Sequence, residues 1–132
     1  MRLSVRLDLP REAGSVPAVR RLLRSALAVL HVDRDTGADL EIAITEACSN
    51  VIHHATGTDS FAVHLDVADH GCAIDVCDEG SGFDPDAMAD AVPGAASERG
   101  RGLYLIKALA ENVRLQSQPR HGSLIHFEKS FA

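Results

Sequence analysis

The hydrophobic pattern of this chain switches between two periods, and the order of the switches limits the folds that it can adopt. Apolar residues recur at every second position in five segments, which predicts half-buried strands over 2–9, 61–68, 72–77, 113–118 and 123–129. They recur every three or four positions in three others, which predicts helices over 15–31, 35–55 and 103–110. Because neighbouring strands are joined by short turns, the order predicts an α/β fold: a two-layer sandwich whose mixed sheet is largely antiparallel, with helices on one face.

Local signals mark the ends of the predicted helices. Ser15 is expected to cap the first helix, and Asp35 or Thr36 the second, because short polar side chains accept hydrogen bonds from the unpaired N–H groups of a first turn. The third helix, over 103–110, is apolar on most faces, which predicts that it is well buried.

Residues 79–100 fit neither period. They are rich in glycine, alanine, aspartate, serine and proline and hold few large apolar side chains. An irregular stretch of about twenty residues within a compact domain is either functional or disordered. Because no linker or internal repeat is visible elsewhere, residues 1–132 are expected to form one domain with a lid over about 83–99.

The net charge of −6 is unevenly distributed. Residues 35–98 contain 14 acidic residues and no lysine or arginine, so this half of the chain does not provide the basic stripe that a nucleic-acid groove needs. If a polyphosphate binds, a cation must mediate the contact. The first basic residues after the gap, Arg99 and Arg101, stand where positive charge would then be required.

The composition also bears on location. No apolar run approaches the roughly 20 residues that cross a bilayer, and the N-terminal segment alternates without a signal-peptide core. We therefore expect a cytoplasmic protein with no membrane association. The three cysteines, Cys48, Cys72 and Cys77, have no paired spacing and are expected to be reduced, partly buried thiols.

A first polar pair lies within the second predicted helix. Glu46 and Asn50 are four residues apart, so they stack on one side of the helix, at the border of its apolar stripe. Glu46 could accept a proton as a general base, and Asn50 could offer an oxygen to Mg²⁺. An exposed helical pair is the alternative. The adjacent His53 and His54 diverge by about 100 degrees, so they do not easily share one ion.

Two glycine-containing segments complete the set. Asp78 ends an apolar strand, where its carboxylate could accept from an exocyclic amine such as that of adenine, while Gly80 and Gly82 allow close backbone approach to a flat ligand. Gly100 and Gly102 precede an apolar helix, whose free N–H groups favour anions. An ordinary turn and a Gly-Arg loop without ligand are the respective alternatives. The third segment lacks both the Rossmann and the Walker glycine spacing.

Taken together, the three segments resemble the boxes of one family. Residues 46–54 are similar to the N box of the GHKL ATPases, residues 78–82 to their first glycine box, and residues 100–106 to their second. Residues 111–115 and 122–127 resemble the single-domain branch, the anti-sigma factor serine/threonine kinases of bacteria. The resemblance covers nearly the whole chain.

The resemblance implies the Bergerat fold and a protein serine/threonine kinase that binds ATP and Mg²⁺. It implies Glu46 as catalytic base, Asn50 as Mg²⁺ ligand, and Asp78 on the adenine amine with Ser123 nearby. The nucleotide-binding set that we expect is Asn50, Asp78, Gly80, Gly82, Arg99, Gly100, Arg101, Gly102, Leu103 and Ser123. Either Arg99 or Arg101 would be the phosphate arginine.

The implied partners are a sigma factor, which members of this branch bind, and an antagonist with a STAS-type fold, which they phosphorylate. A homodimer is also implied. Three alternatives remain: a nucleotide-dependent binding module without phosphotransfer, the catalytic domain of a sensor histidine kinase, and a structural adaptor without a nucleotide site. The second is weaker, because no phosphoacceptor helix pair precedes the first strand.

Overall fold

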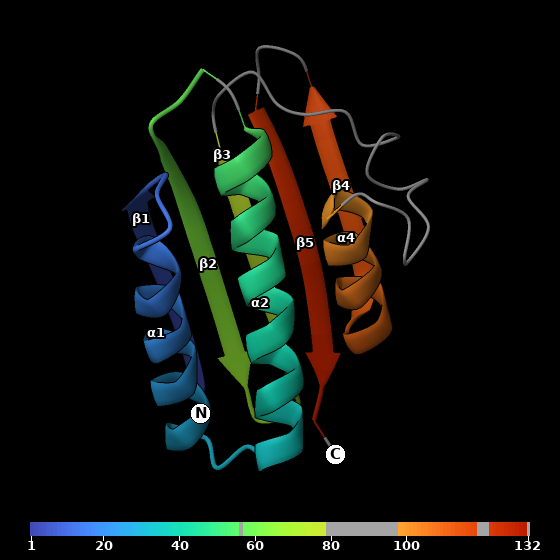
Figure 1. Ribbon diagram of the computed structural model, residues 1–132. Helices are drawn as coiled ribbons and strands as arrows, with labels where there is room; N and C mark the ends of the chain where they lie inside the picture. The colour runs from blue at the N-terminus through green and yellow to red at the C-terminus, as the bar shows by residue number, and fades with distance from the viewer. Residues whose placement is uncertain (56, 79–97, 119–121, 132) are drawn as a thin grey trace.

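The computed structural model describes residues 1–55, 57–78, 98–118 and 122–131. Five strands and three helices lie within these ranges (Figure 1). In chain order they are β1 (Arg2–Pro10), α1 (Ser15–Val29), α2 (Arg34–His54), β2 (Ser60–Ala68), β3 (Gly71–Asp78), α4 (Glu98–Leu109), β4 (Glu111–Gln118) and β5 (Gly122–Ser130).

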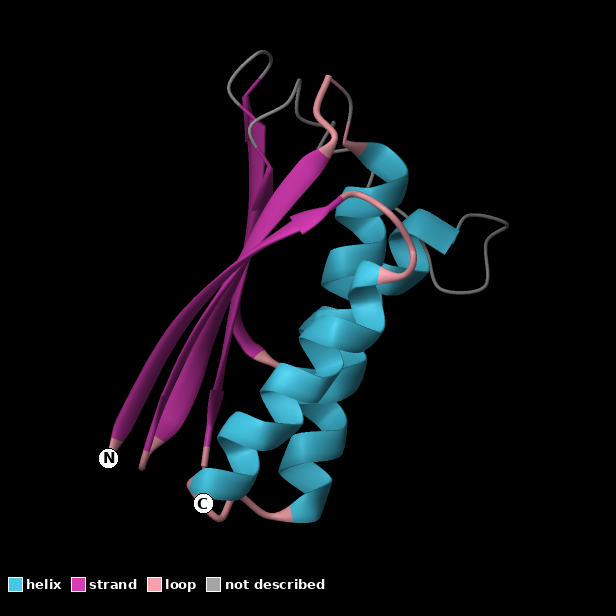
Figure 2. Cartoon of the chain, turned by 90° about the vertical axis from the view of Figure 1, so that its left-hand side faces the viewer, coloured by secondary structure: helices cyan, strands magenta, loops and turns pink. Residues whose placement is uncertain are grey.

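The strands form one sheet in the order β1-β2-β3-β5-β4, and each neighbouring pair is antiparallel. The three helices cover one face of this twisted sheet and leave the other face bare (Figure 2). The predicted two-layer α/β sandwich is therefore confirmed. Within the described ranges, none of the helices combines the length and apolarity that crossing a membrane requires.

The core lies between the helices and the covered face of the sheet. The alternating burial of β2 and β3 places every second side chain against the helices. The predicted apolar stripe of α2 is buried along its whole length: Leu40, Ala43, Ile44, Ala47 and Val51 are at most 1% exposed. Phe127 of β5 is fully buried among them.

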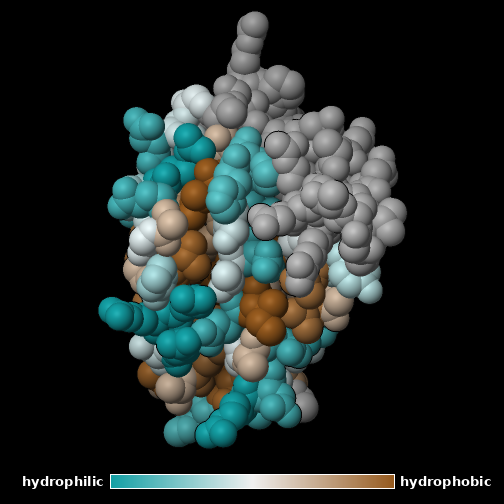
Figure 3. Space-filling model, in the orientation of Figure 1, coloured by the Kyte–Doolittle hydropathy of each residue, from teal (hydrophilic) through white to brown (hydrophobic). Residues whose placement is uncertain are grey.

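The outer surface of the helical layer is a mixture of polar and apolar residues (Figure 3). Large hydrophobic side chains exposed in the described part of the chain are Met1, Val29, Ile42 and Tyr104. Tyr104 corrects one expectation. Although Leu103 and Ile106 are buried, Tyr104 is 51% exposed, so α4 has an open outer face and is not buried all round.

Two predicted helix caps are wrong. The N-cap of α2 is Asp33, whose carboxylate accepts from the backbone N–H of Thr36 at 3.0 Å, so neither Asp35 nor Thr36 has that role. Gly14 is the N-cap of α1, and no side chain caps that helix. The hydroxyl of Ser15 instead donates to the carbonyl of Pro10 at 2.6 Å, which ties the start of α1 to the end of β1.

The cysteines behave as expected. All three fall in the described residues and form no disulfide. Burial raises the pKa of the Cys48 thiol to about 12, and burial is also the main reason that the pKa of Cys72 is raised to about 12. These thiols therefore remain protonated and act as small apolar groups in the core.

The bare face of the sheet carries a row of polar side chains. His126 on β5 lies between two carboxylates, with its Nδ1 2.6 Å from Asp75 Oδ1 and its Nε2 2.8 Å from Glu128 Oε2. His64 and Arg114 stand beside this group on the neighbouring strands, opposite Asp75 and His126. Burial opposes the charge on the imidazole, but the hydrogen bonds to Glu128 and Asp75 outweigh it, so the pKa of His126 is raised above 6.5.

The raised pKa predicts a pH-dependent contribution to stability. Protonated His126 stabilises the fold below the unfolded-state pKa of about 6.5, and this contribution is lost as the pH rises through the higher folded-state value. We expect His126→Gln to lower the free energy of unfolding by about 1 kcal/mol near pH 6 and by less near pH 8.

Urea unfolding at both pH values measures this difference. His70→Gln is the control, because it changes an exposed histidine of the β2–β3 turn and leaves the group of Asp75, His126 and Glu128 in place. A loss of stability in His126→Gln that is equal at both pH values would contradict the assignment.

Candidate active site

Four elements bring the predicted segments to the same end of the molecule. α2 and β3 finish at this end, and α4 and β5 start from it, in the upper part of Figure 1. The antiparallel register places Asp78, the last residue of β3, directly opposite Ser123 near the start of β5. Segments that are 45 residues apart in the chain are therefore neighbours in the sheet.

The centre of the site is the contact between α4 and α2. A Cβ atom added to Gly102 would lie 3.0 Å from Glu46 Oε2, 3.2 Å from Asn50 Oδ1 and 3.5 Å from Asn50 Nδ2. The backbone of α4 thus passes directly over the two polar side chains of α2, and any larger residue at position 102 would require them to shift by a few tenths of an ångström. Glu46 and Asn50 are not an exposed helical pair, because they face the first turns of a second helix.

Asn50 is buried without a complete set of partners. It is 4% exposed, and among the described residues its Nδ2 has no hydrogen-bond partner. A buried amide N–H without a hydrogen-bond partner costs about 1–3 kcal/mol. A ligand that accepts a hydrogen bond from this carboxamide would therefore remove that free-energy cost. The amide oxygen is also the kind of ligand that Mg²⁺ accepts. The residues at this point therefore fit a magnesium-bound phosphate group.

The start of α4 corrects the sequence reading. The helix begins at Glu98, so Gly100 and Gly102 lie inside its first turns and not in a loop before it. The unpaired N–H groups of a first helical turn favour anions, so the anion site that we expect moves to residues 98–101. The model describes the backbone of Arg99, Gly100 and Arg101 but not their side chains, so the choice between the two arginines stays a prediction.

A second polar pair closes the end of the sheet. Asp78 and Ser123 are 4% and 6% exposed, and the Ser123 hydroxyl donates to Asp78 Oδ2. This hydrogen bond from Ser123 fixes the orientation of the Asp78 carboxylate. A buried acceptor held in one orientation is suited to selecting an amine over a carbonyl.

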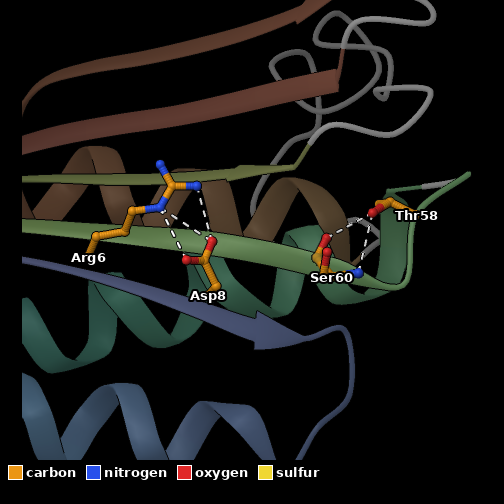
Figure 4. Close-up of polar contacts among 4 residues, drawn as sticks. All are labelled: Arg6, Asp8, Thr58 and Ser60. Atoms are coloured by element: carbon orange, nitrogen blue, oxygen red, sulfur yellow. Dashed lines mark hydrogen bonds and ion pairs between the residues drawn. The ribbon is translucent and has the colours of Figure 1, made fainter.

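A hollow of about 180 Å³ lies at this end of the sheet, mainly on the face opposite the helices, because Arg6, Asp8, Ala62 and Cys77 occupy the strand positions that alternate with the helix-facing ones. Its lining includes polar residues that the sequence reading did not single out (Figure 4), and the full set is Arg6, Asp8, Thr58, Ser60, Phe61, Ala62, Cys77 and Asp78. Arg6 Nη2 donates to Asp8 Oδ1 at 3.1 Å, and this hydrogen bond lowers the pKa of Asp8. These residues come from three strands and the α2–β2 connection, so no local motif marks them.

The remaining predicted residues divide into two groups. The described residues do not include Gly80, Gly82 or most of the expected lid over 83–99. Only lid residues 98 and 99, at the start of α4, are described. Leu103 is 2% exposed, and its contact with a nucleotide remains a prediction. The rings of His53 and His54 are 6.2 Å apart and tilted, and no cluster of metal-ligating side chains occurs in the described part of the chain.

Sequence comparisons connect this geometry to known proteins. A family model described as the histidine kinase-like ATPase domain matches residues 9–128. The serine-protein kinase RsbW of Bacillus licheniformis is 32% identical over 124 residues, which cover 85% of this chain and 77% of that protein. RsbW of Bacillus subtilis (strain 168) is 30% identical over 124 residues, covering 86% and 78%.

Solved structures share the fold at lower identity. The crystal structure of the RsbU and RsbW domains of Rv1364c from Mycobacterium tuberculosis matches 98% of this chain with a TM-score of 0.75 at 21% identity. This chain spans only 32% of that longer one. A chain of the SiaB–SiaC complex from Pseudomonas aeruginosa matches 96% of this chain and 89% of its own length, with a TM-score of 0.63 at 16% identity.

The contact at Gly102 yields a prediction. In Gly102→Ala the new Cβ displaces Glu46 and Asn50, so we expect the affinity for a magnesium-bound ATP analogue to fall at least about tenfold. The stability should change little, because alanine favours a helix over glycine by about 1 kcal/mol and offsets the strain. Isothermal titration and thermal unfolding measure the two effects.

Gly37→Ala is the matched control. Gly37 also lies in a helix, but its added Cβ would meet only Leu27 Cδ1, at an ordinary 3.6 Å. This variant should keep the full affinity. Unchanged binding by Gly102→Ala would show that the two side chains do not meet the ligand.

Proposed function

This chain belongs to the histidine kinase-like ATPase family and is a protein serine kinase, and from that premise we propose that it binds ATP with Mg²⁺ where α2 and α4 meet and transfers the γ-phosphate to a partner protein. The family membership confirms the resemblance that the three sequence segments predicted. The single observation that carries the proposal is that Glu46 and Asn50 lie beneath Gly102, where Asn50 Nδ2 has no hydrogen-bond partner among the residues that the structure describes.

Glu46 is the proposed catalytic base. Its carboxylate lies against the first turns of α4, where unpaired N–H groups attract phosphate. As a serine or threonine hydroxyl attacks the γ-phosphorus, Glu46 takes the hydroxyl proton, the new O–P bond forms, and the bond to the β-phosphate oxygen breaks to release ADP. Positioning and charge stabilisation supply most of the rate in such a transfer.

Asn50 and the start of α4 would hold the phosphates. Bound Mg²⁺ neutralises phosphate charge, and the Asn50 oxygen is its proposed protein ligand. We propose that the backbone of Gly100 and Gly102 and the side chain of Arg99 or Arg101 complete the phosphate site. This arrangement explains how a site within the acidic half of the chain could accept a polyphosphate.

Asp78 is the proposed adenine selector. Its buried carboxylate, oriented by Ser123, would accept a hydrogen bond from the exocyclic amine, with Gly80 and Gly82 allowing the base to approach the backbone. The buried setting supports this role. A ligand group that cannot donate a hydrogen bond to the carboxylate costs more binding free energy there than it would in water.

The partners remain proposals that rest on family resemblance. We propose a STAS-type antagonist as the phosphoacceptor and a sigma factor that the kinase sequesters, with the protein acting in the cytoplasm as a homodimer. The names of the relatives support a partner-directed role, since they include serine-protein kinases and a chain from the SiaB–SiaC complex.

The assignment of Glu46 as catalytic base predicts that ATP binding and phosphoryl transfer can be separated. Glu46→Gln keeps the shape and hydrogen-bonding capacity of the side chain but removes its basicity. We expect ATP affinity within about threefold of wild type and a transfer rate at least about 100-fold lower. Titration with ATP and Mg²⁺, followed by incubation with labelled ATP and candidate STAS-type acceptors, tests both parts.

Glu41→Gln on the same helix is the control, because Glu41 pairs with Arg24 away from the site. It should retain transfer. Full activity of Glu46→Gln would exclude Glu46 as the base, whereas wild-type protein that binds ATP but labels none of the acceptors would favour the binding module.

The adenine assignment predicts a change in base selection. Wild-type protein should prefer ATP to GTP, because guanine presents a carbonyl where adenine presents its amine. Asp78→Asn weakens the acceptor, and we expect ATP affinity to fall about tenfold or more and the preference over GTP to shrink. Competition binding with ATP and GTP measures this preference. An unaltered preference in Asp78→Asn would place the adenine base elsewhere.

A further inference from the structure

Arg11, immediately after β1, bonds to the end of α2 and to the connection between α2 and β2. Its backbone N–H donates to the carbonyl of Asp59 at 2.7 Å. Its guanidinium donates from Nε to the Thr58 carbonyl at 2.9 Å and from Nη1 to the Ile52 carbonyl at 2.8 Å. All three acceptors belong to the end of α2 and its connection to β2, which are more than 40 residues away in the chain.

The contact with Ile52 secures the last turn of α2. The final four carbonyls of a helix have no partner within the helix, and those of Val51 and Ile52 are both among them. The N–H of Ala55 satisfies Val51, and Arg11 satisfies Ile52. The guanidinium charge also suits the negative end of the helix dipole. Ile52 is two residues beyond Asn50, so Arg11 holds the turn that presents the carboxamide.

The contact with Thr58 secures the connection between α2 and β2. Thr58 Oγ1 donates to the carbonyl of Ser60 at 3.1 Å and accepts from its N–H at 3.3 Å, as Figure 4 shows. Ser60 begins β2, which pairs with β3, the strand that ends at Asp78. One guanidinium therefore bonds to both the helix that carries Asn50 and the connection that leads into this pair of strands.

We infer that Arg11 is a positioning residue of the nucleotide site, which sets the placement of the Asn50 turn relative to the paired strands β2 and β3, the second of which ends at Asp78. Arg11 acts through the backbone of Ile52 and Thr58 and need not touch the nucleotide. Since it rests on the proposed function, the inference requires that the wild-type protein bind ATP. The planar fork of arginine can serve two carbonyls at once, and the single ammonium of lysine cannot reproduce that geometry.

The test compares Arg11→Met and Arg11→Lys with wild type. Arg24→Met is the matched control, because Arg24 is an exposed arginine whose Nε donates to Glu41 at 3.0 Å on the outer side of the helices. Isothermal titration with ADP and with ATP, each with Mg²⁺, is run well below the unfolding temperature of every variant. We expect Arg11→Met to bind about tenfold more weakly, Arg11→Lys to recover only part of the loss, and Arg24→Met to match wild type.

The outcomes separate positioning from bulk stability. A purely structural role would lower the unfolding temperature of Arg11→Met and leave the affinity of its folded form unchanged, which would overturn the inference. Should Arg11→Met fail to fold, hydrogen exchange on wild type gives the answer, because nucleotide must slow exchange at residues 57–60. No slowing there would also overturn it. Wild-type protein that binds no nucleotide overturns the proposed function itself, whereas normal binding by Arg11→Met overturns only this inference.

Discussion

The close approach of α4 to α2 at Gly102 is the constraint on which the site depends. Any side chain at this position would meet the carboxylate of Glu46 at 3.0 Å and the carboxamide of Asn50 at 3.2 Å. Because the two helices touch here, the first turn of α4 is held beside two polar groups that a helix surface would otherwise expose to water. The same contact explains how Asn50 can be 4% exposed although it carries an amide.

The sheet supplies the second half of the site by a different means. An antiparallel register, and not helix packing, sets Ser123 opposite Asp78 at the end of β3. The helices contribute groups suited to phosphate and metal, while the strands contribute a buried acceptor suited to a base. We propose that one nucleotide engages both sets of groups, because the four elements share one end of the molecule (Figure 1).

Periodicity predicted the fold well because burial on one face repeats with each element. The stripe of α2 and the alternation of β2 and β3 are examples. The start of α4 was missed because glycine is a poor helix former, and packing against α2 overrides that local preference. The contacts of Arg11 and Thr58 could not be predicted from pattern, since they link segments that carry no shared periodic signal.

Polar contacts at three points hold the long α2 helix in place. Asp33 caps its first turn, Lys129 Nζ on β5 lies 3.4 Å from Asp39 Oδ2, and Arg11 grips the carbonyl of Ile52. The 21 residues of α2 form a helix roughly 30 Å long. A helix anchored in this way cannot shift along its axis or rotate by one residue without breaking several hydrogen bonds. Glu46 and Asn50 therefore keep one spacing relative to each other and one position relative to the sheet.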